Sequence, residues 1–129
     1  MGVAKGNGYY IARGVYFVTW ALNTGASVGS WTQLYTLPDR TFEVFTTGSL
    51  NGTVILQGRN ALASTLTSGS KGYTLNDSRG VGNAISLTTG KAVQVLENTV
   101  CIRPVMTALT TTATKNGITA SVLAETRLK

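Results

Sequence analysis

Histidine is absent from this chain, and cysteine occurs once, as Cys101. Without an imidazole, neither the Ser-His-Asp nor the Cys-His route to an activated nucleophile can be assembled. The commonest metal ligand is also missing, so one chain cannot build a structural zinc site from its own side chains. A lone thiol excludes an internal disulfide, which fits a reducing compartment. Because Cys101 lies in the apolar run Val100–Ile102, we expect it to fill the core.

Acidic residues are scarce as well. The chain has five of them: Asp39, Glu43, Asp77, Glu97 and Glu125. Hydrolysis by paired carboxylates needs two facing acids at a cleft, and the spacing of these five enforces no such pair. The segments Gly69–Gly72 and Thr89–Lys91 fall short of the full phosphate-loop spacing, so we interpret them as turns. The sequence therefore predicts no enzymatic activity, no catalytic residue, no cofactor and no metal.

Charge is low and dispersed. Charged residues make up 12% of the chain, about half the share of a typical soluble domain. Such a neutral surface suits a protein packed against neighbours, although an ordinary Thr-rich β domain has the same composition. The net charge of +6 comes from basic residues scattered along the chain, without the dense stripe of a nucleic-acid footprint. We expect no nucleic-acid partner, while the positive field favours approach to an acidic protein surface.

No apolar run is long enough for a transmembrane helix, and the N-terminal residues lack the apolar stretch of a signal peptide. We therefore expect no membrane partner and synthesis in a cytosol.

Composition and turn residues indicate an all-β fold of one domain. Threonine, a strand-favouring residue, occurs 21 times, and glycine, which punctuates turns, occurs 15 times. No segment shows a sustained helical period, and only residues 60–67 lean towards a helix. Eight strands are expected, at residues 15–22, 41–46, 53–57, 72–75, 84–87, 91–96, 99–106 and 118–126. This spacing is typical of a sandwich or barrel, and we predict an antiparallel β-sandwich that is jelly-roll-like.

Three local signals make this prediction more specific. In the last strand, apolar and polar residues alternate from Ile118 to Glu125 with Leu123 as the exception, as in a half-buried antiparallel strand. The dipeptides Asn51-Gly52 and Asn116-Gly117 favour tight turns, and the first is the strongest hairpin signal in the chain. Pro104 lacks a backbone donor, so its strand should lie at an edge or carry a bulge.

Two segments are poor candidates for the core. Residues 1–14 are expected to form an N-terminal arm before a single domain at 15–129, and residues 59–72 form a long Ser/Thr/Gly loop. Both are where we expect partner contacts, with disorder in the absence of a partner as the alternative. The candidate interface residues are Tyr9, Tyr10, Arg13, Trp31, Arg59 and Lys71.

The aromatic residues leave a choice between packing and ligand stacking. Trp20 lies in an apolar strand and is expected in the core, whereas Trp31 lies in a loop-like stretch and could anchor a partner. Stacking on a sugar or on single-stranded nucleic acid is the alternative use of these rings.

The order of the motifs resembles small β-rich proteins encoded beside the major capsid protein of tailed phages, the head decoration or cement proteins. The likeness spans roughly residues 15–127. The first motif that carries it is the strand with Trp20 and Leu22, and the last is a strand ending near Arg127. Between them, in order, come residues 38–44, 48–58 and 82–87, and then Glu97-Asn98 leading into 102–105. Each motif is short, so the specificity lies in their order. A departure occurs at Arg59-Asn60-Ala61, where similar sequences often have Ser-Asn-Asp.

This resemblance implies a jelly-roll-like fold, a homodimer or homotrimer, and binding to the major capsid protein on the outer surface of the virion shell. A cement protein of this kind would stabilise the mature capsid between its subunits. The alternative is a carbohydrate- or receptor-binding module of a virion spike or fibre. A coat protein that binds RNA is a weaker third hypothesis, because basic residues are dispersed and no dimerising helix is evident.

Overall fold

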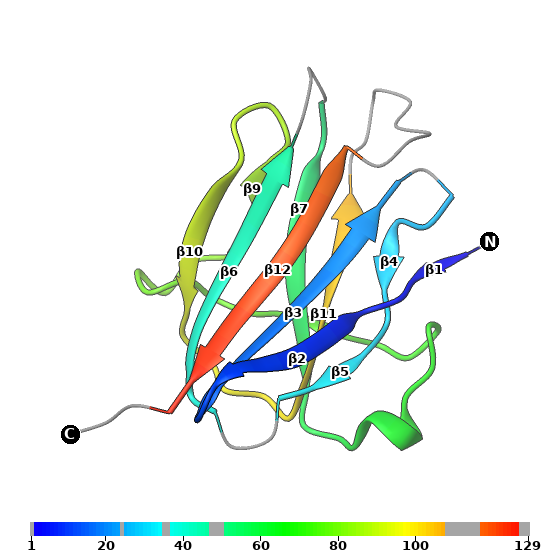
Figure 1. The fold of residues 1–129 in the computed structure, drawn as a ribbon. Helices are drawn as coiled ribbons and strands as arrows, with labels where there is room; N and C mark the ends of the chain where they lie inside the picture. The colour runs from blue at the N-terminus through cyan, green and yellow to red at the C-terminus, as the bar shows by residue number, and fades with distance from the viewer. Residues whose placement is uncertain (1, 24, 35–36, 47–50, 108–116, 127–129) are drawn as a thin grey trace.

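Two β-sheets pack face to face in the computed structural model, which describes residues 2–23, 25–34, 37–46, 51–107 and 117–126 (Figure 1). This confirms the predicted all-β sandwich, in which nearly all strand pairs are antiparallel. Over these residues the structure contains one short 3₁₀ helix, Ala63–Thr65, within the segment that leaned towards a helix. No helix among them is long and apolar enough to span a membrane.

The first sheet has five strands, and its central strand pairs with both of its neighbours along its whole length. In spatial order these strands are β10 (Lys91–Val95), β6 (Asp39–Thr46), β12 (Ile118–Glu125), β3 (Val15–Leu22) and β2 (Asn7–Ala12). All of their pairings are antiparallel. The predicted alternation of β12 is confirmed, because Ile118, Ala120, Val122 and Ala124 are all buried.

The second sheet has seven strands built around β11 and β7. Its main path runs β1 (Val3–Ala4), β4 (Val28–Gly29), β11 (Cys101–Thr107), β7 (Thr53–Arg59) and β8 (Tyr73–Thr74). Two more strands lie off this path: β5 (Thr32–Gln33) pairs with β11, and β9 (Ile85–Ser86) pairs with β7. One pairing among the described strands is parallel, that of β1 with β4, and it places residues 3–4 at the edge of this sheet.

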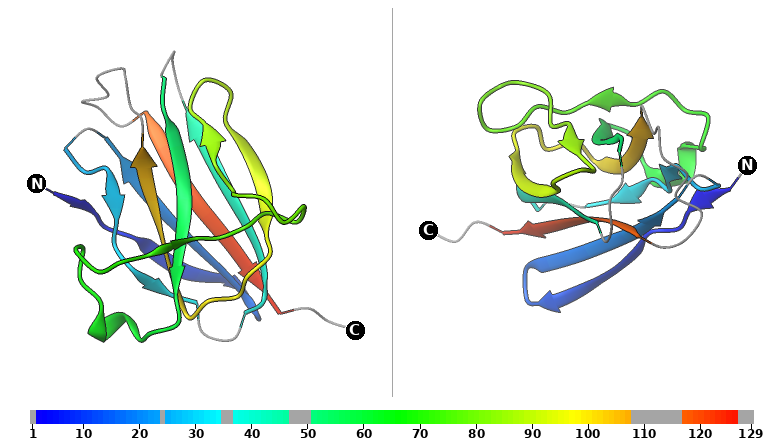
Figure 2. Two further views of the ribbon diagram at one scale, coloured as in Figure 1. Left: turned by 180° about the vertical axis from the view of Figure 1, so that it is seen from behind. Right: turned by 90° about the horizontal axis from the view of Figure 1, so that it is seen from above.

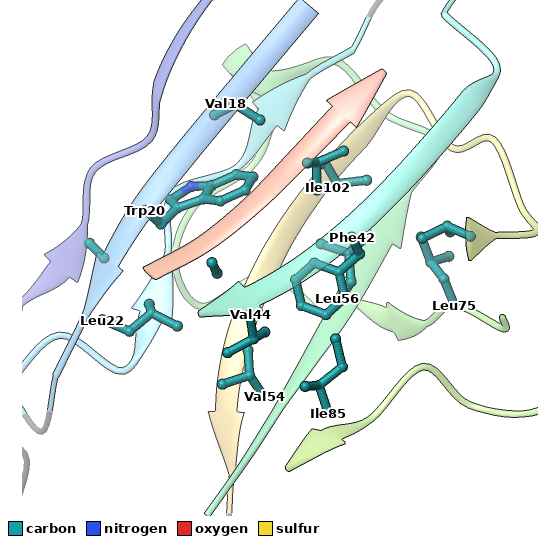
Figure 3. Close-up of a cluster of buried hydrophobic side chains, with 14 of the residues drawn as sticks. Val18, Trp20, Leu22, Phe42, Val44, Val54, Leu56, Leu75, Ile85 and Ile102 are labelled. Carbon is teal, nitrogen blue, oxygen red and sulfur yellow. The ribbon is translucent and has the colours of Figure 1, made fainter. Parts of the chain in front are cut away.

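The space between the sheets is filled by side chains from both inner faces (Figure 3). Trp20 from β3 is fully buried, as expected, and its indole N–H donates to the Ser30 carbonyl at 3.1 Å. Phe42, Leu56 and Ile102 are also without solvent exposure. Each such side chain contributes about 1.5–3 kcal/mol by leaving water, so the core is the main source of stability. Cys101 is fully buried and free, as predicted.

Neither Asn-Gly dipeptide joins a pair of neighbouring strands, so the hairpin prediction is wrong. Strands β6 and β7, on either side of Asn51-Gly52, belong to different sheets, and so do β11 and β12. Both dipeptides therefore lie between strands of different sheets and not between two strands of one sheet. Residues 47–50 and 108–116, including Asn116, lie outside the described residues. The tight hairpin is β2–β3, whose turn contains Gly14 at a φ of 73°.

Pro104 lies in the middle of the second sheet, contrary to the prediction of an edge strand or a bulge in its own strand. It pairs with Leu56 on the β7 side. On the other side, pairing is interrupted between Val28↔Val105 and Thr32↔Ile102, so the irregularity lies in the neighbouring segment. A Cβ on Gly29 would lie 2.5 Å from the Pro104 ring. Because Gly29 has no side chain, the proline ring fits at the point where the hydrogen bonds between β11 and the 28–32 segment are interrupted. The backbone N–H that proline lacks is not needed at that point.

The segment expected to form an arm pairs instead with both sheets. Residues 3–4 form β1 at the edge of the second sheet, and residues 7–12 form β2 at the edge of the first. Between them the chain crosses at Gly6, whose N–H donates to the Ser30 hydroxyl at 2.8 Å. A Cβ at this position would approach the indole nitrogen of Trp20 to 2.8 Å. The N-terminal segment therefore lies along one side of the sandwich (Figure 1).

Candidate partner-binding surfaces

The polar residues that the structure brings together have mainly structural roles. Asp77 accepts hydrogen bonds from the guanidinium of Arg79 at 2.8 and 3.1 Å, and these bonds lower the pKa of the carboxyl group. Both oxygens of Glu97 are bonded to Asn76, at 2.6 Å from its backbone N–H and 2.8 Å from its amide. Within the described ranges, no group of three His, Cys, Asp or Glu side chains could hold a metal ion.

Strand β2 carries three consecutive exposed hydrophobic residues. Tyr9, Tyr10 and Ile11 are 51%, 57% and 54% exposed, and all six residues of the strand are exposed. Each tyrosine ring makes an edge-to-face contact with a ring of β3: Tyr9 with Phe17 at 5.9 Å and Tyr10 with Tyr16 at 5.0 Å between centroids. Such pairs fix the orientation of the tyrosines. Two predicted interface residues thus stand in rigid, accessible positions on the edge strand.

The outer side of the five-stranded sheet, which we call the open face, is not covered by any described segment (Figure 2, right). The strand register aligns Tyr9, Phe17 and Leu123 across three neighbouring strands, and this apolar row continues into Thr41. Phe45 adds a ring that is 59% exposed. The open face is therefore largely uncharged.

The few charges of the open face are all acidic. Outward positions of β6 and β12 hold Asp39, Glu43 and Glu125, and no lysine or arginine occupies an outward position in the five strands. The register places Asp39 directly opposite Glu125, a juxtaposition that their spacing in the sequence did not reveal. Asp39 lines a groove of about 440 Å³ in which Glu125 takes no part.

The outer side of the seven-stranded sheet is partly covered by residues 60–72, which we call the strap. Arg103 holds it: its Nη1 donates to the Ser68 carbonyl at 2.8 Å and its Nη2 to the Ser70 carbonyl at 2.9 Å. Its Nε donates to the side-chain oxygen of Gln57 at 3.0 Å. The guanidinium carbon lies 4.4 Å from the centroid of the Trp31 ring, and the residue is 6% exposed. Carbonyl dipoles and the indole face thus solvate a buried cation that has no carboxylate partner among these contacts.

The predicted interface residues therefore fall into two groups. Tyr9, Tyr10 and Arg13 belong to the β2–β3 hairpin at the edge of the open face. The other three lie at the strap. Trp31 donates from its indole N–H to the Thr67 carbonyl at 3.0 Å, and Arg59 donates to the Lys71 carbonyl at 2.7 Å. The Trp31 N–H and one ring face are thus used inside the molecule.

Arg103 and Gln57 were not among the predicted residues. One signal was present in the sequence: Arg103 is the charged residue in the otherwise apolar run Cys101–Met106. A charge within such a run indicates a buried, fully bonded group.

A groove of about 430 Å³ lies beside the end of β7. It is lined by Gly58, Arg59, Asn60, Tyr73, Thr74, Leu75, Glu97 and Thr99. The Tyr73 ring is 58% exposed and faces the Lys71 ammonium at 5.2 Å. An exposed ring beside an arginine, an amide and a carboxylate is the kind of lining that sugar-binding grooves use.

Comparison with protein-family models, curated proteins and solved structures finds no match to this chain. Its function must therefore be inferred from these surfaces and from the order of the sequence motifs.

Proposed function

We propose that this protein is a phage capsid cement protein without enzymatic activity. It binds the major capsid protein on the outer surface of the mature shell, between subunits, and stabilises the particle. The observation that carries the proposal is the open face with its adjoining edge strand, which is weakly charged and free of described cover. The order of the sequence motifs, which resembles head decoration proteins, supports the shell as the partner.

The open face alone is smaller than a standard protein interface. Its three central strands have eight residues each, with a rise of about 3.3 Å per residue and about 4.8 Å between neighbouring strands, so the five strands present a plate of at most roughly 26 by 19 Å, or about 500 Å². Since a standard interface buries ~800 Å² per partner, the β2 edge has to contribute as well. One such contact is modest, but binding that favours the assembled lattice over free subunits stabilises the lattice by mass action.

Self-association would strengthen the effect. In the proposed function the protein acts as a homodimer or homotrimer, because one oligomer then holds several capsid subunits and gains avidity.

The direct test mixes the purified protein with mature shells that lack it. We expect the protein to sediment with the shells and to raise their resistance to heat and to osmotic shock. Shells that neither bind the protein nor gain resistance would contradict the proposal. Dispersed capsid subunits serve as the control, since the proposed function requires preference for the lattice.

A second candidate function is a carbohydrate-binding module of a spike or fibre. It is favoured by the groove that Tyr73 shares with Arg59 and Glu97. Two measurements separate the candidates. Hundreds of copies per particle fit a cement protein, whereas a few tens fit a spike or fibre. Binding to a glycan array that Tyr73→Ala abolishes would favour the module.

A further inference from the structure

The two edges of the five-stranded sheet differ in their protection. At one edge, β10 begins with Lys91, and the 76–77 segment lies alongside its end: Val95 forms a bridge with Asp77, and the Leu96 N–H donates to Asn76. At the other edge, β2 contains no charged residue and no proline, and no described strand pairs with its outer side. Sheet edges in soluble proteins are normally blocked by charges, proline, bulges, shortness or a covering segment. Of these, β2 has a bulge, since its register with β3 shifts between Tyr10 and Ala12. Residues 7–10 before the bulge form a regular, uncharged edge, and this part of β2 indicates a binding site.

A basic residue lies beyond each end of this edge. Lys5 precedes β2 by two residues and Arg13 follows it directly. If a second copy added its own β2 in antiparallel fashion, the basic residue beyond each end of one strand would approach the basic residue beyond the opposite end of the other. Like charges directly opposite each other destabilise a strand pair. The flanking residues therefore disfavour a second copy and favour a strand with acidic residues at its ends.

We propose that β2 accepts an extended segment of a shell protein as a sixth strand, with acidic residues at both ends of that segment. Backbone hydrogen bonds supply affinity in this mode of binding, and alternate side chains supply specificity. The added strand packs its side chains against Tyr9 on the open face and against Tyr10 on the other side. That the partner is a shell protein rests on the proposed function. That β2 is a binding edge flanked by basic residues does not depend on the proposed function.

The first experiment measures binding of β2 variants to purified mature shells that lack the protein. Tyr9→Lys and Ile11→Lys put a charge on the edge and should weaken binding by about tenfold or more. Val81→Lys is the matched control: Val81 is 49% exposed, similar to these residues, but lies in the turn next to β10 at the opposite edge of the sheet, and binding of this variant should change by less than about twofold. Phe45→Lys changes the open face three strands away from the edge.

The outcomes are decisive in both directions. Slowed hydrogen exchange of the 7–12 amides in the shell-bound wild type supports strand addition and does not depend on how the variants fold. Equal binding by wild type and both edge variants overturns the inference while leaving the cement function intact. Loss of binding in Phe45→Lys with full binding in the edge variants assigns the contact to the open face and also overturns it. A wild type that binds no shells contradicts the cement function itself.

The second experiment tests the flanking charges without shells, by sedimentation of the free protein. Lys5→Glu alone, or Arg13→Glu alone, makes the edge complementary to a second copy, so the mass should double relative to the wild type at micromolar concentration. The double variant again has like charges and should return to the wild-type mass. Unchanged mass in both single variants overturns the role of these residues. A wild-type mass that Tyr9→Lys halves would show that the occupant is a second copy.

Discussion

Replacing Arg103 with lysine should loosen the strap and destabilise the protein, although the charge is kept. Three nitrogens of Arg103 donate at 2.8–3.0 Å to three separate acceptors, on Gln57, Ser68 and Ser70. An ammonium also has three N–H donors, but they radiate from one nitrogen and cannot reproduce the planar fork that reaches these three acceptors, so we expect two charged hydrogen bonds to be lost, each worth about 1.5–3 kcal/mol when its partners stay buried. The strap carbonyls can regain water, so we expect a net loss of about 2–3 kcal/mol. For a domain of this size that loss lowers Tm by roughly 10 °C.

Urea unfolding and hydrogen exchange provide the assay. The free energy of unfolding should fall by the amount above, and amides at 66–72 should exchange faster than those in β12. Arg59→Lys is the matched control, because Arg59 makes one such bond, to the Lys71 carbonyl, which a lysine can replace. We expect it to cost less than about 0.5 kcal/mol. Equal stability losses in the two variants would refute the assignment of Arg103 as the residue that holds the strap.

Three further predictions concern buried groups. Asn83 is 1% exposed and bonds both backbone groups of Leu56, so Asn83→Asp should cost about 3 kcal/mol at pH 7. Burial raises the pKa of the new carboxyl group above its unfolded value, so urea titrations should show the deficit shrinking as the pH falls towards 4 (about the unfolded pKa); a deficit independent of pH would contradict this. Arg79 lowers the pKa of Asp77, so this stabilisation is present above about pH 4 and lost as the pH falls through the folded pKa. Asp77→Asn should remove that part of the acid sensitivity, and identical pH profiles would count against it. Burial raises the pKa of Cys101, so its thiol should react with a disulfide reagent in urea and resist it in the native protein; equal rates would be the contrary result.

The strands were predictable because alternation is a local property. Residues 15–22 were expected as a strand and form β3 with the same bounds, and the last strand has the predicted buried face. How the strands are joined was not predictable in the same way. Asn51-Gly52 has the residues of a hairpin turn, but the turn type does not specify whether the next strand returns to the same sheet or crosses to the other one.

The candidate surfaces were predictable only in part. Tyr9 and Tyr10 stood out as aromatic residues in a Gly-rich segment, and the structure places them on an exposed edge. Arg103 was missed because its acceptors lie 33–46 residues away along the chain. The position of Pro104 depends on Gly29 in another strand, so no inspection of its own strand could have given it.

A cryo-electron microscopy map of the intact particle would decide whether this protein binds the capsid. We expect copies of this sandwich on the outer surface of the shell, between capsid subunits, with the β2 edge next to a strand of the shell protein. A map that lacks the domain on the shell, or places it on a spike or tail fibre, would contradict it.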